Sequence, residues 1–191
     1  MIKFFFYFLV AILITKNAYA HPHVWADTRT KLIIENDNLI GVNHHWEFDD
    51  FFSLEIIEMI DLNKDKQINE KEAKEAYNTA FISLEDYSYF THIFSNKQKQ
   101  KLKTVVDFKP SIQDSNKLIY DFTAYLENPI NIKTNKVKFS IYDDSRYIDI
   151  KLGDRIAISF SEDVNIDFNI IEDSSNSIWQ GMLNPRTIIF K

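Results

Sequence analysis

Alternating apolar and polar positions predict a pair of strands after residue 22. From His23 to Glu35 nearly every second residue is apolar or β-branched, which is typical of a half-buried strand. The polar triplet at 36–38 favours a turn, and a second strand is predicted from Leu39 to Phe48. In this returning strand one face carries His44, Trp46 and Phe48, and the other carries His45, Glu47 and Asp49. The predicted hairpin places residues near 49–51 beside the start of the first strand.

The next segment predicts helices. Asp49 or Asp50 can cap a helix that ends near Ile60, and this helix is so apolar on all sides that it must be packed under another element. A stripe of alanines predicts a second helix over 70–81, and a shorter third helix is expected over 84–94.

The period returns to two after a lysine-rich loop at 96–101. Strands are predicted at 103–112, 117–126, 136–142, 147–152, 155–160, 164–171 and 187–190. Together with the hairpin these segments favour an α+β fold, with β-sandwich-like antiparallel sheets and a helical insertion at about 50–94. We expect residues 21–191 to form a single domain.

Residues 1–20 have the pattern of a signal peptide. Lys3 precedes an apolar run from Phe4 to Ile14, and the pattern Ala18-x-Ala20 supplies the small residues that a signal peptidase requires. We therefore expect His21 to begin the mature chain and the protein to be periplasmic. The apolar run is short for a membrane span, but an uncleaved anchor is the alternative. No later apolar stretch approaches the roughly 18 residues of a span.

Charge and composition argue against several classes of function. The leader holds two of the 22 basic residues and none of the 28 acidic ones, so the remaining chain has a net charge of −8 with His neutral. This charge argues against a nucleic-acid partner. The chain contains no cysteine, no glycine-rich phosphate loop and no Gly-x-Ser-x-Gly elbow. We therefore expect a protein that is not an enzyme.

The start of the expected mature chain offers a metal chelate. His21 would carry a free α-amine and an imidazole, and His23 adds a second imidazole. Pro22 has no N–H, which excludes the square-planar mode that uses a deprotonated amide at the second position. The remaining donors suit Ni(II), Cu(II) or Zn(II). The hairpin places Asp49 and Asp50 nearby as further ligands or as acceptors that orient a histidine.

The alternative interpretation is an edge strand with two solvated histidines. His44 and His45 lie about 15 Å farther along the returning strand, at ~3.3 Å per residue. They join an N-terminal site only if the sheet curls or another strand brings the site to them.

The stretch 61–72 matches a Ca²⁺-binding EF-hand loop between two predicted helices. Its oxygen donors are Asp61, Asn63 and Asp65 at positions one, three and five, the carbonyl of Gln67 at seven and Glu72 at twelve. The sixth position, where the turn favours Gly, is Lys66, and a left-handed Lys costs roughly 1 kcal/mol. Asn69 and Glu72 also form a helix capping box, so a purely structural reading is equally consistent with the residues.

Several motifs together carry a family resemblance over about the first 150 residues. They are the leader followed by His21-Pro22-His23-Val24-Trp25, then Trp46-x-Phe48-Asp49-Asp50-x-Phe52-Ser53, the EF-hand-like loop, Tyr87-x-Tyr89-Phe90-Thr91 and Ile141-Tyr142-Asp143. The chain resembles a family of uncharacterised bacterial periplasmic proteins, labelled the periplasmic component of an ABC-type transport system and associated with nickel/cobalt-type permeases. Lys66 in place of Gly, and Asp50 in place of the commoner Glu, depart from the family pattern.

Three hypotheses follow. The first is a periplasmic accessory protein that binds a divalent transition metal (Ni, Co, Zn or Cu) for an inner-membrane metal permease and carries a weak structural Ca²⁺ site. The second is an oxidative copper enzyme that uses His21. The third is a structural or interaction domain stabilised by Ca²⁺.

Overall fold

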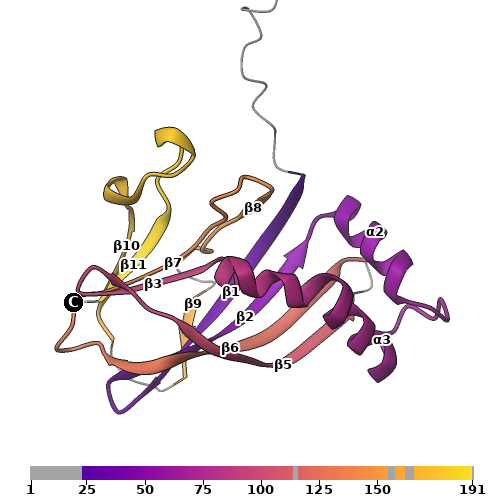
Figure 1. The fold of residues 1–191 in the computed structure, drawn as a ribbon, viewed down its shortest axis with the longest axis horizontal. Coiled ribbons are helices and arrows are strands. Elements are labelled where there is room, and N and C mark those ends of the chain that lie inside the picture. The colour runs from indigo at the N-terminus through magenta and orange to yellow at the C-terminus, as the bar shows by residue number, and fades with distance from the viewer. Residues whose placement is uncertain (1–22, 114–115, 155–157, 162–165, 191) are drawn as a thin grey trace, which may run out of the picture.

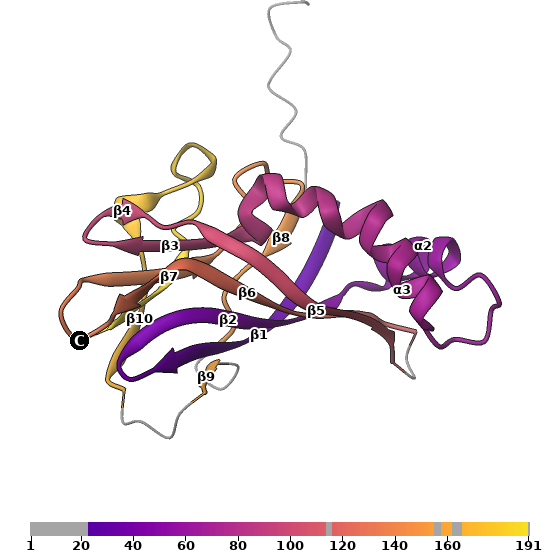
Figure 2. The same ribbon diagram turned by 60° about the horizontal axis from the view of Figure 1, so that its bottom comes forward.

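The computed structural model describes residues 23–113, 116–154, 158–161 and 166–190, which form two layered β-sheets with helices at one end (Figure 1, Figure 2). The first sheet, in spatial order, consists of β5 (Leu102–Ile112), β6 (Leu118–Asn131), β2 (Asn38–Phe48), β1 (Val24–Glu35) and β8 (Ile148–Ile150), with β9 (Ile158–Phe160) also paired to β1. The second sheet consists of β10 (Phe168–Glu172), β11 (Arg186–Phe190), β7 (Val137–Ile141), β3 (Thr91–Ser95) and β4 (Gln98–Lys99). The α+β, sandwich-like fold with a helical insertion is confirmed.

The predicted hairpin forms between β1 and β2. Asn36 and Asp37 take up the left-handed backbone that a tight turn needs, with φ of 48° and 64°. The strands then run antiparallel, with Ala26 opposite Phe48. Residues on the two faces of β2 alternate between buried and partly exposed, as the sequence predicts.

The core lies between the sheets and continues under the helical segment. Trp46 and Phe122 from the first sheet, and Phe139 and Ile188 from the second, have no exposed surface. The rings of Trp46 and Phe122 meet edge to face with centroids 4.7 Å apart. Each fully buried large apolar side chain contributes roughly 1.5–3 kcal/mol to stability.

The helical insertion covers one end of the first sheet. It contains α2 (Asp50–Ile60), α3 (Glu70–Ala76), a π-helical segment η1 (Tyr77–Phe81) and a 3-10 segment η2 (Ile82–Phe90). Asp49 caps α2 as expected, since its side chain accepts hydrogen bonds from the first-turn amides. Phe81 is fully buried and its ring stacks on Phe108 of β5 with centroids 4.0 Å apart. This contact fixes the helical segment to the sheet.

The prediction of a third helix over 84–94 is wrong beyond Phe90. Ser88 and Tyr89 have left-handed backbone, with φ of 53° and 48°, which ends the helical run. The next residues form β3, and Ile93 pairs with Phe139 of β7. A short apolar run does not by itself distinguish a helix from a buried strand, and here a partner distant in sequence decides. The expected loop at 96–101 likewise contains the short strand β4.

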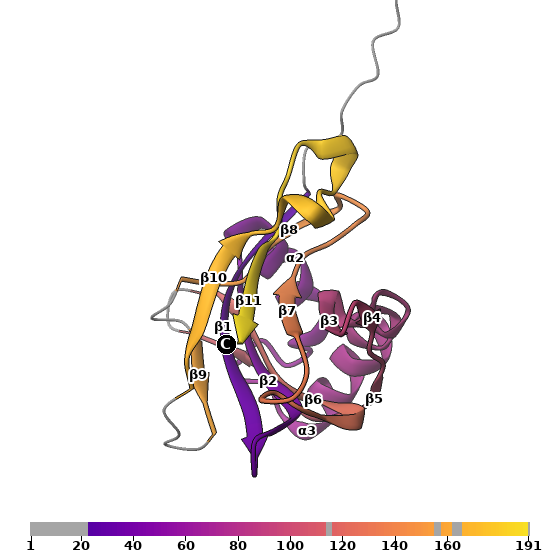
Figure 3. The same ribbon diagram turned by 90° about the vertical axis from the view of Figure 1, so that its left-hand side faces the viewer.

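One edge of the first sheet contains parallel strands beside the antiparallel ones. β8 and β9 run parallel to β1, with Val24 opposite Ile148 and Thr30 opposite Ile158. The chain reaches this edge from β7 in the other sheet, so no tight turn dictates the strand direction. In Figure 3 the loop between β10 and β11 (yellow, top) extends beyond the sheets. Within the described ranges, no helix is long and apolar enough to cross a membrane.

Candidate metal sites

The EF-hand-like loop connects α2 to α3, and its first residue organises it. Asp61 is buried, with 5% of its surface exposed. Its Oδ1 accepts a hydrogen bond from the Asp65 amide (3.2 Å) and its Oδ2 accepts one from the Lys66 amide (3.0 Å). Lys66 has a φ of 61°, so the sixth position is left-handed despite the missing glycine. The turn that an EF-hand loop requires is therefore present.

Asn63 and Asp65, at the third and fifth positions, also accept hydrogen bonds from backbone amides, on the exposed side of the loop. Asn63 Oδ1 accepts from the Asp65 amide (3.0 Å), and Asp65 Oδ1 accepts from the Gln67 amide (2.8 Å). The Asn63 amide group also donates to Asp65 Oδ2 (2.9 Å). The two side chains are thus held against each other at the rim of the loop.

Glu72 closes the loop from the other end. It is 1% exposed, its Oε1 accepts from the Leu62 amide (2.9 Å) and its Oε2 accepts from the Asn69 amide (3.0 Å). Asn69 in turn accepts from the Glu72 amide (3.2 Å), which completes the capping box that the sequence predicts. Both carboxylate oxygens of Glu72 therefore point at backbone amides.

The donor types of this loop fit Ca²⁺, which prefers oxygen ligands. The side chains are not gathered around a common point, however. Across the described residues, no group of three or more His, Cys, Asp or Glu lies close enough to hold a metal ion. Coordination by Glu72 would compete with the hydrogen bonds that its carboxylate accepts from the amides of Leu62, Asn63 and Asn69.

The predicted transition-metal ligands are placed only in part. His21 lies outside the described residues. His23 is exposed, its amide donates to the Tyr147 carbonyl (2.9 Å) and its ring centroid lies 5.4 Å from that of Tyr147. As expected, the hairpin brings the start of β1 beside Asp49: the Trp25 amide donates to Asp49 Oδ2 (2.8 Å).

Both aspartates at this position already have partners. Asp49 Oδ1 accepts from the Phe51 and Phe52 amides at 2.9 Å and 3.1 Å, in addition to the bond from Trp25. Asp50 is 81% exposed and its carboxylate lies 2.8 Å from the Lys117 ammonium. Asp49 therefore has a structural role as a cap, and Asp50 is the freer of the two carboxylates.

His44 and His45 do not join the N-terminal site. His44 lies opposite Thr30, roughly 20 Å along the strand from the start of β1 at ~3.3 Å per residue. It has no exposed surface, its Nε2 lies 3.1 Å from Thr91 Oγ1, and burial lowers its pKa to about 3. His45 faces the other side of the sheet, where its Nδ1 lies 2.8 Å from Asp121.

A pocket of about 660 Å³ on the second sheet was not predicted from the sequence. Its lining comes from β3, β7 and β11, from Lys97 after β3 and Lys136 before β7, and from the segment that follows β10, which are far apart in the chain. No local motif joins such residues, so only the strand order reveals the site.

Comparison with known proteins places the chain in a family. Residues 6–178 match the family described as "Protein of unknown function (DUF1007)". A protein of Haemophilus influenzae named "Uncharacterized protein" is 26% identical over 153 residues, which cover 80% of this chain and 73% of that protein. Because the family match spans most of the chain, the protein belongs to the DUF1007 family of proteins of unknown function.

Proposed function

We propose that this protein is a non-enzymatic metal-binding protein and that the loop from Asp61 to Glu72 is its Ca²⁺ site. The observation that supports the proposal best is the hydrogen bonding of Asp61 to the amides of Asp65 and Lys66 around a left-handed turn. This arrangement holds positions one, five and six of the loop as an EF-hand requires.

The structure favours weak binding. Glu72 accepts from the Leu62, Asn63 and Asn69 amides, so the ion competes with three hydrogen bonds. The carboxylates of Asp61, Asp65 and Glu72 also repel one another until a cation is present. An affinity in the range of extracellular modules, with a Kd of about 10⁻⁴ to 10⁻³ M, is the expected outcome.

Thermal unfolding with and without Ca²⁺ tests the proposal. At a free Ca²⁺ concentration ten times the Kd, binding to the folded state alone adds about 1.4 kcal/mol, which corresponds to a rise in Tm of roughly 3–6 °C for a domain of this size. Mg²⁺ should have a smaller effect, because it demands tighter octahedral geometry.

The informative variant is Glu72→Gln. Glutamine has one acceptor oxygen, which can keep the capping-box bond from the Asn69 amide, but its NH2 group then faces the Leu62 amide. The Ca²⁺-free protein should therefore lose about 1–3 kcal/mol of stability, and the Ca²⁺ response should disappear because the charge is removed. Glu70→Gln on the same helix is the matched control, because Glu70 is exposed and lies outside the ligand set. An unchanged Ca²⁺ response in Glu72→Gln would leave the loop with a structural role alone.

A second candidate function is transition-metal binding at the N-terminus. It is favoured by the bond between the Trp25 amide and Asp49, which brings the first residues of β1 and a carboxylate side by side. His23 is exposed next to this point. We propose that His21 and His23, with Asp50 or Asp49 as an oxygen ligand or acceptor, bind Ni, Co, Zn or Cu.

Calorimetric titration with Ni²⁺, Zn²⁺ and Cu²⁺ tests this site. A protein that begins at His21 should bind, whereas a protein with one Gly added before His21 should lose the amine chelate, and His23→Ala should bind more weakly. Equal affinity in all three proteins would refute the site. O₂ consumption with Cu²⁺ and a reductant would favour the alternative of an oxidative copper enzyme.

The cellular setting is part of the same proposal and is supported by the residues of the leader and by the resemblance described above. We propose a periplasmic location and an inner-membrane metal permease as the partner. Detection of the processed N-terminus at His21 in a periplasmic extract tests the location.

A further inference from the structure

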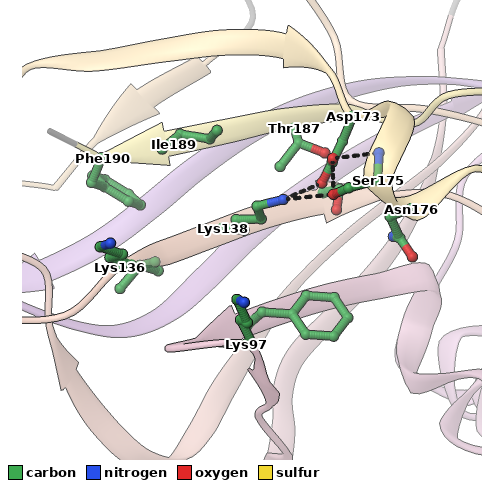
Figure 4. Close-up of a pocket in the computed structure, with 12 residues that line it drawn as sticks. Lys97, Lys136, Lys138, Asp173, Ser175, Asn176, Thr187, Ile189 and Phe190 are labelled. Atoms are coloured by element: carbon green, nitrogen blue, oxygen red, sulfur yellow. Dashed lines mark hydrogen bonds and ion pairs between the residues drawn. The ribbon is translucent and has the colours of Figure 1, made fainter.

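The pocket of about 660 Å³ lies on the outward face of the second sheet (Figure 4). Phe94, Lys138 and Ile189 form a row across β3, β7 and β11, because Lys138 is the register partner of both other residues. Cross-strand partners point to the same face of a sheet. The neighbouring residues Ile93, Phe139 and Ile188 point to the core instead and are at most 1% exposed.

The floor of the pocket is apolar. Phe94 and Ile189 line the pocket and are only partly buried, although they are large apolar side chains. The volume falls within the range of about 300–1,000 Å³ that is typical of small-molecule sites. A ligand with an apolar body would remove this surface from water.

One of the three lysines that line the pocket is already neutralised. The Lys138 ammonium lies 2.6 Å from Asp173 Oδ2 and 3.2 Å from Ser175 Oγ. Figure 4 shows this ammonium joined by dashed lines to both side chains. Lys138 therefore closes one end of the pocket together with the segment after β10 and does not offer a free charge.

The other two lysines are adjacent, and neither has an ion-pair partner in the part of the chain that the structure describes. The Asn96 amide donates to the Lys136 carbonyl (3.0 Å) and the Lys136 amide donates to Asn96 Oδ1 (3.1 Å), so Lys97, which follows Asn96, lies next to Lys136. Both lysines are exposed and neither forms an ion pair with the described residues. Two unpaired cations beside an apolar floor are unusual on a chain whose net charge is −6.

We propose that this pocket binds a small amphipathic carboxylate. Its alkyl body packs against Phe94 and Ile189, and its carboxylate accepts hydrogen bonds from the ammonium groups of Lys97 and Lys136. Charge-assisted bonds of this kind fix the head group, and burial of the apolar body supplies most of the affinity. The proposal is independent of both metal sites, which lie on other elements.

Calorimetric titration of the full protein with four probes tests separately whether the carboxylate and the apolar body of the ligand are needed for binding. Dodecanoate, below its micellar concentration, should bind with one-to-one stoichiometry and a negative heat-capacity change. Dodecanol lacks the charge and should bind more weakly, and dodecyltrimethylammonium should not bind because it meets Lys97 and Lys136. Acetate has no apolar body and should show no measurable binding.

Variants locate the site. The double substitution Lys97→Gln/Lys136→Gln should weaken dodecanoate binding by about five- to twentyfold, as expected for the loss of two exposed charge pairs. Ile189→Glu should abolish binding by placing a negative charge on the floor. Lys71→Gln/Lys74→Gln on α3 is the matched control and should bind like the unaltered protein, since both lysines are exposed and lie outside the pocket.

The outcomes separate clearly. Dodecanoate binding that survives Lys97→Gln/Lys136→Gln unchanged, or equal binding of the cationic probe, overturns the proposal. Failure of dodecanoate to bind the unaltered protein also overturns it. All of the variants change surface residues and retain the core, and thermal unfolding checks that each of them is folded.

Discussion

Replacement of His44 by glutamine tests whether a neutral histidine is buried in the core. The His44 ring has no exposed surface and stacks on Phe122 with centroids 4.8 Å apart. The hydroxyl of Thr91 donates to the Tyr89 carbonyl (2.9 Å), so it accepts at its contact with His44 Nε2 (3.1 Å). The proton of the neutral ring is therefore on Nε2, and Nδ1 is buried with no hydrogen-bond partner among the described residues.

The size of the effect follows from linkage between protonation and folding. Burial lowers the pKa of His44 to about 3 in the folded protein, from 6.5 in the unfolded chain. The unfolded chain therefore takes up a proton as the pH falls below 6.5, and the folded protein does not until about pH 3. Between pH 7 and pH 5 this difference costs about 2 kcal/mol of unfolding free energy.

Urea unfolding at pH 7 and pH 5, followed by tryptophan fluorescence, measures this loss. His44→Gln has no titrating ring, so its unfolding free energy should fall by about 2 kcal/mol less than that of the unaltered protein over this interval. Burial also lowers the pKa of His92, although a hydrogen bond to the Tyr142 carbonyl opposes the shift. That contribution is present in both proteins and cancels in the comparison.

His23→Gln serves as the control for the loss of a histidine as such, because the His23 side chain is exposed. It should retain the full pH dependence of the unaltered protein. An equal loss of stability in His44→Gln and in the unaltered protein between pH 7 and pH 5 would refute the burial of a neutral ring at position 44.

Three further substitutions test other parts of the structure by urea unfolding. Gly41→Ala should lower the free energy of unfolding by about 1–3 kcal/mol, because an added Cβ would lie 2.8 Å from the carbonyl oxygen of Ala124 in the adjacent strand. An unchanged free energy of unfolding would mean that the two strands separate easily. Lys66→Gly should stabilise the Ca²⁺-free protein by about 1 kcal/mol, because it removes a left-handed Lys; destabilisation would contradict that backbone assignment. Ser53→Ala should cost about 1–3 kcal/mol, because the buried hydroxyl accepts from the Leu118 amide (3.0 Å); no loss would argue against this link between α2 and β6.

How far the sequence predicts this structure depends on how local the determining contacts are. The hairpin, its turn at Asn36 and Asp37, the cap at Asp49 and the capping box at Glu72 depend on residues close in the chain, and all four are confirmed. The strand at 91–95 was missed because β7, more than 40 residues later, supplies its hydrogen bonds.

The candidate sites follow the same rule. The EF-hand-like loop is contiguous, so the sequence predicts its capping box, but it does not reveal that Glu72 also accepts from the Leu62 amide. The pocket on the second sheet was not predicted, because Phe94, Lys138 and Ile189 become neighbours only through strand order. Similarly, the parallel edge strands beside β1 depend on a crossover between sheets that periodicity cannot show.

Helix α2 links the two candidate metal sites and constrains how each can be tested. Asp49 caps its start and also binds the Trp25 amide, and the Asp61 amide closes its end by donating to the Ile57 carbonyl (2.9 Å). Loss of the cap costs about 0.5–2 kcal/mol and loosens the first turn of the helix, so Asp49→Ala would perturb the start of β1 and the helix leading to the Ca²⁺ loop together. Weaker metal binding in that variant would therefore not identify Asp49 as a ligand. Substitution of His23 and addition of a residue before His21 leave α2 intact, and these changes separate coordination from folding.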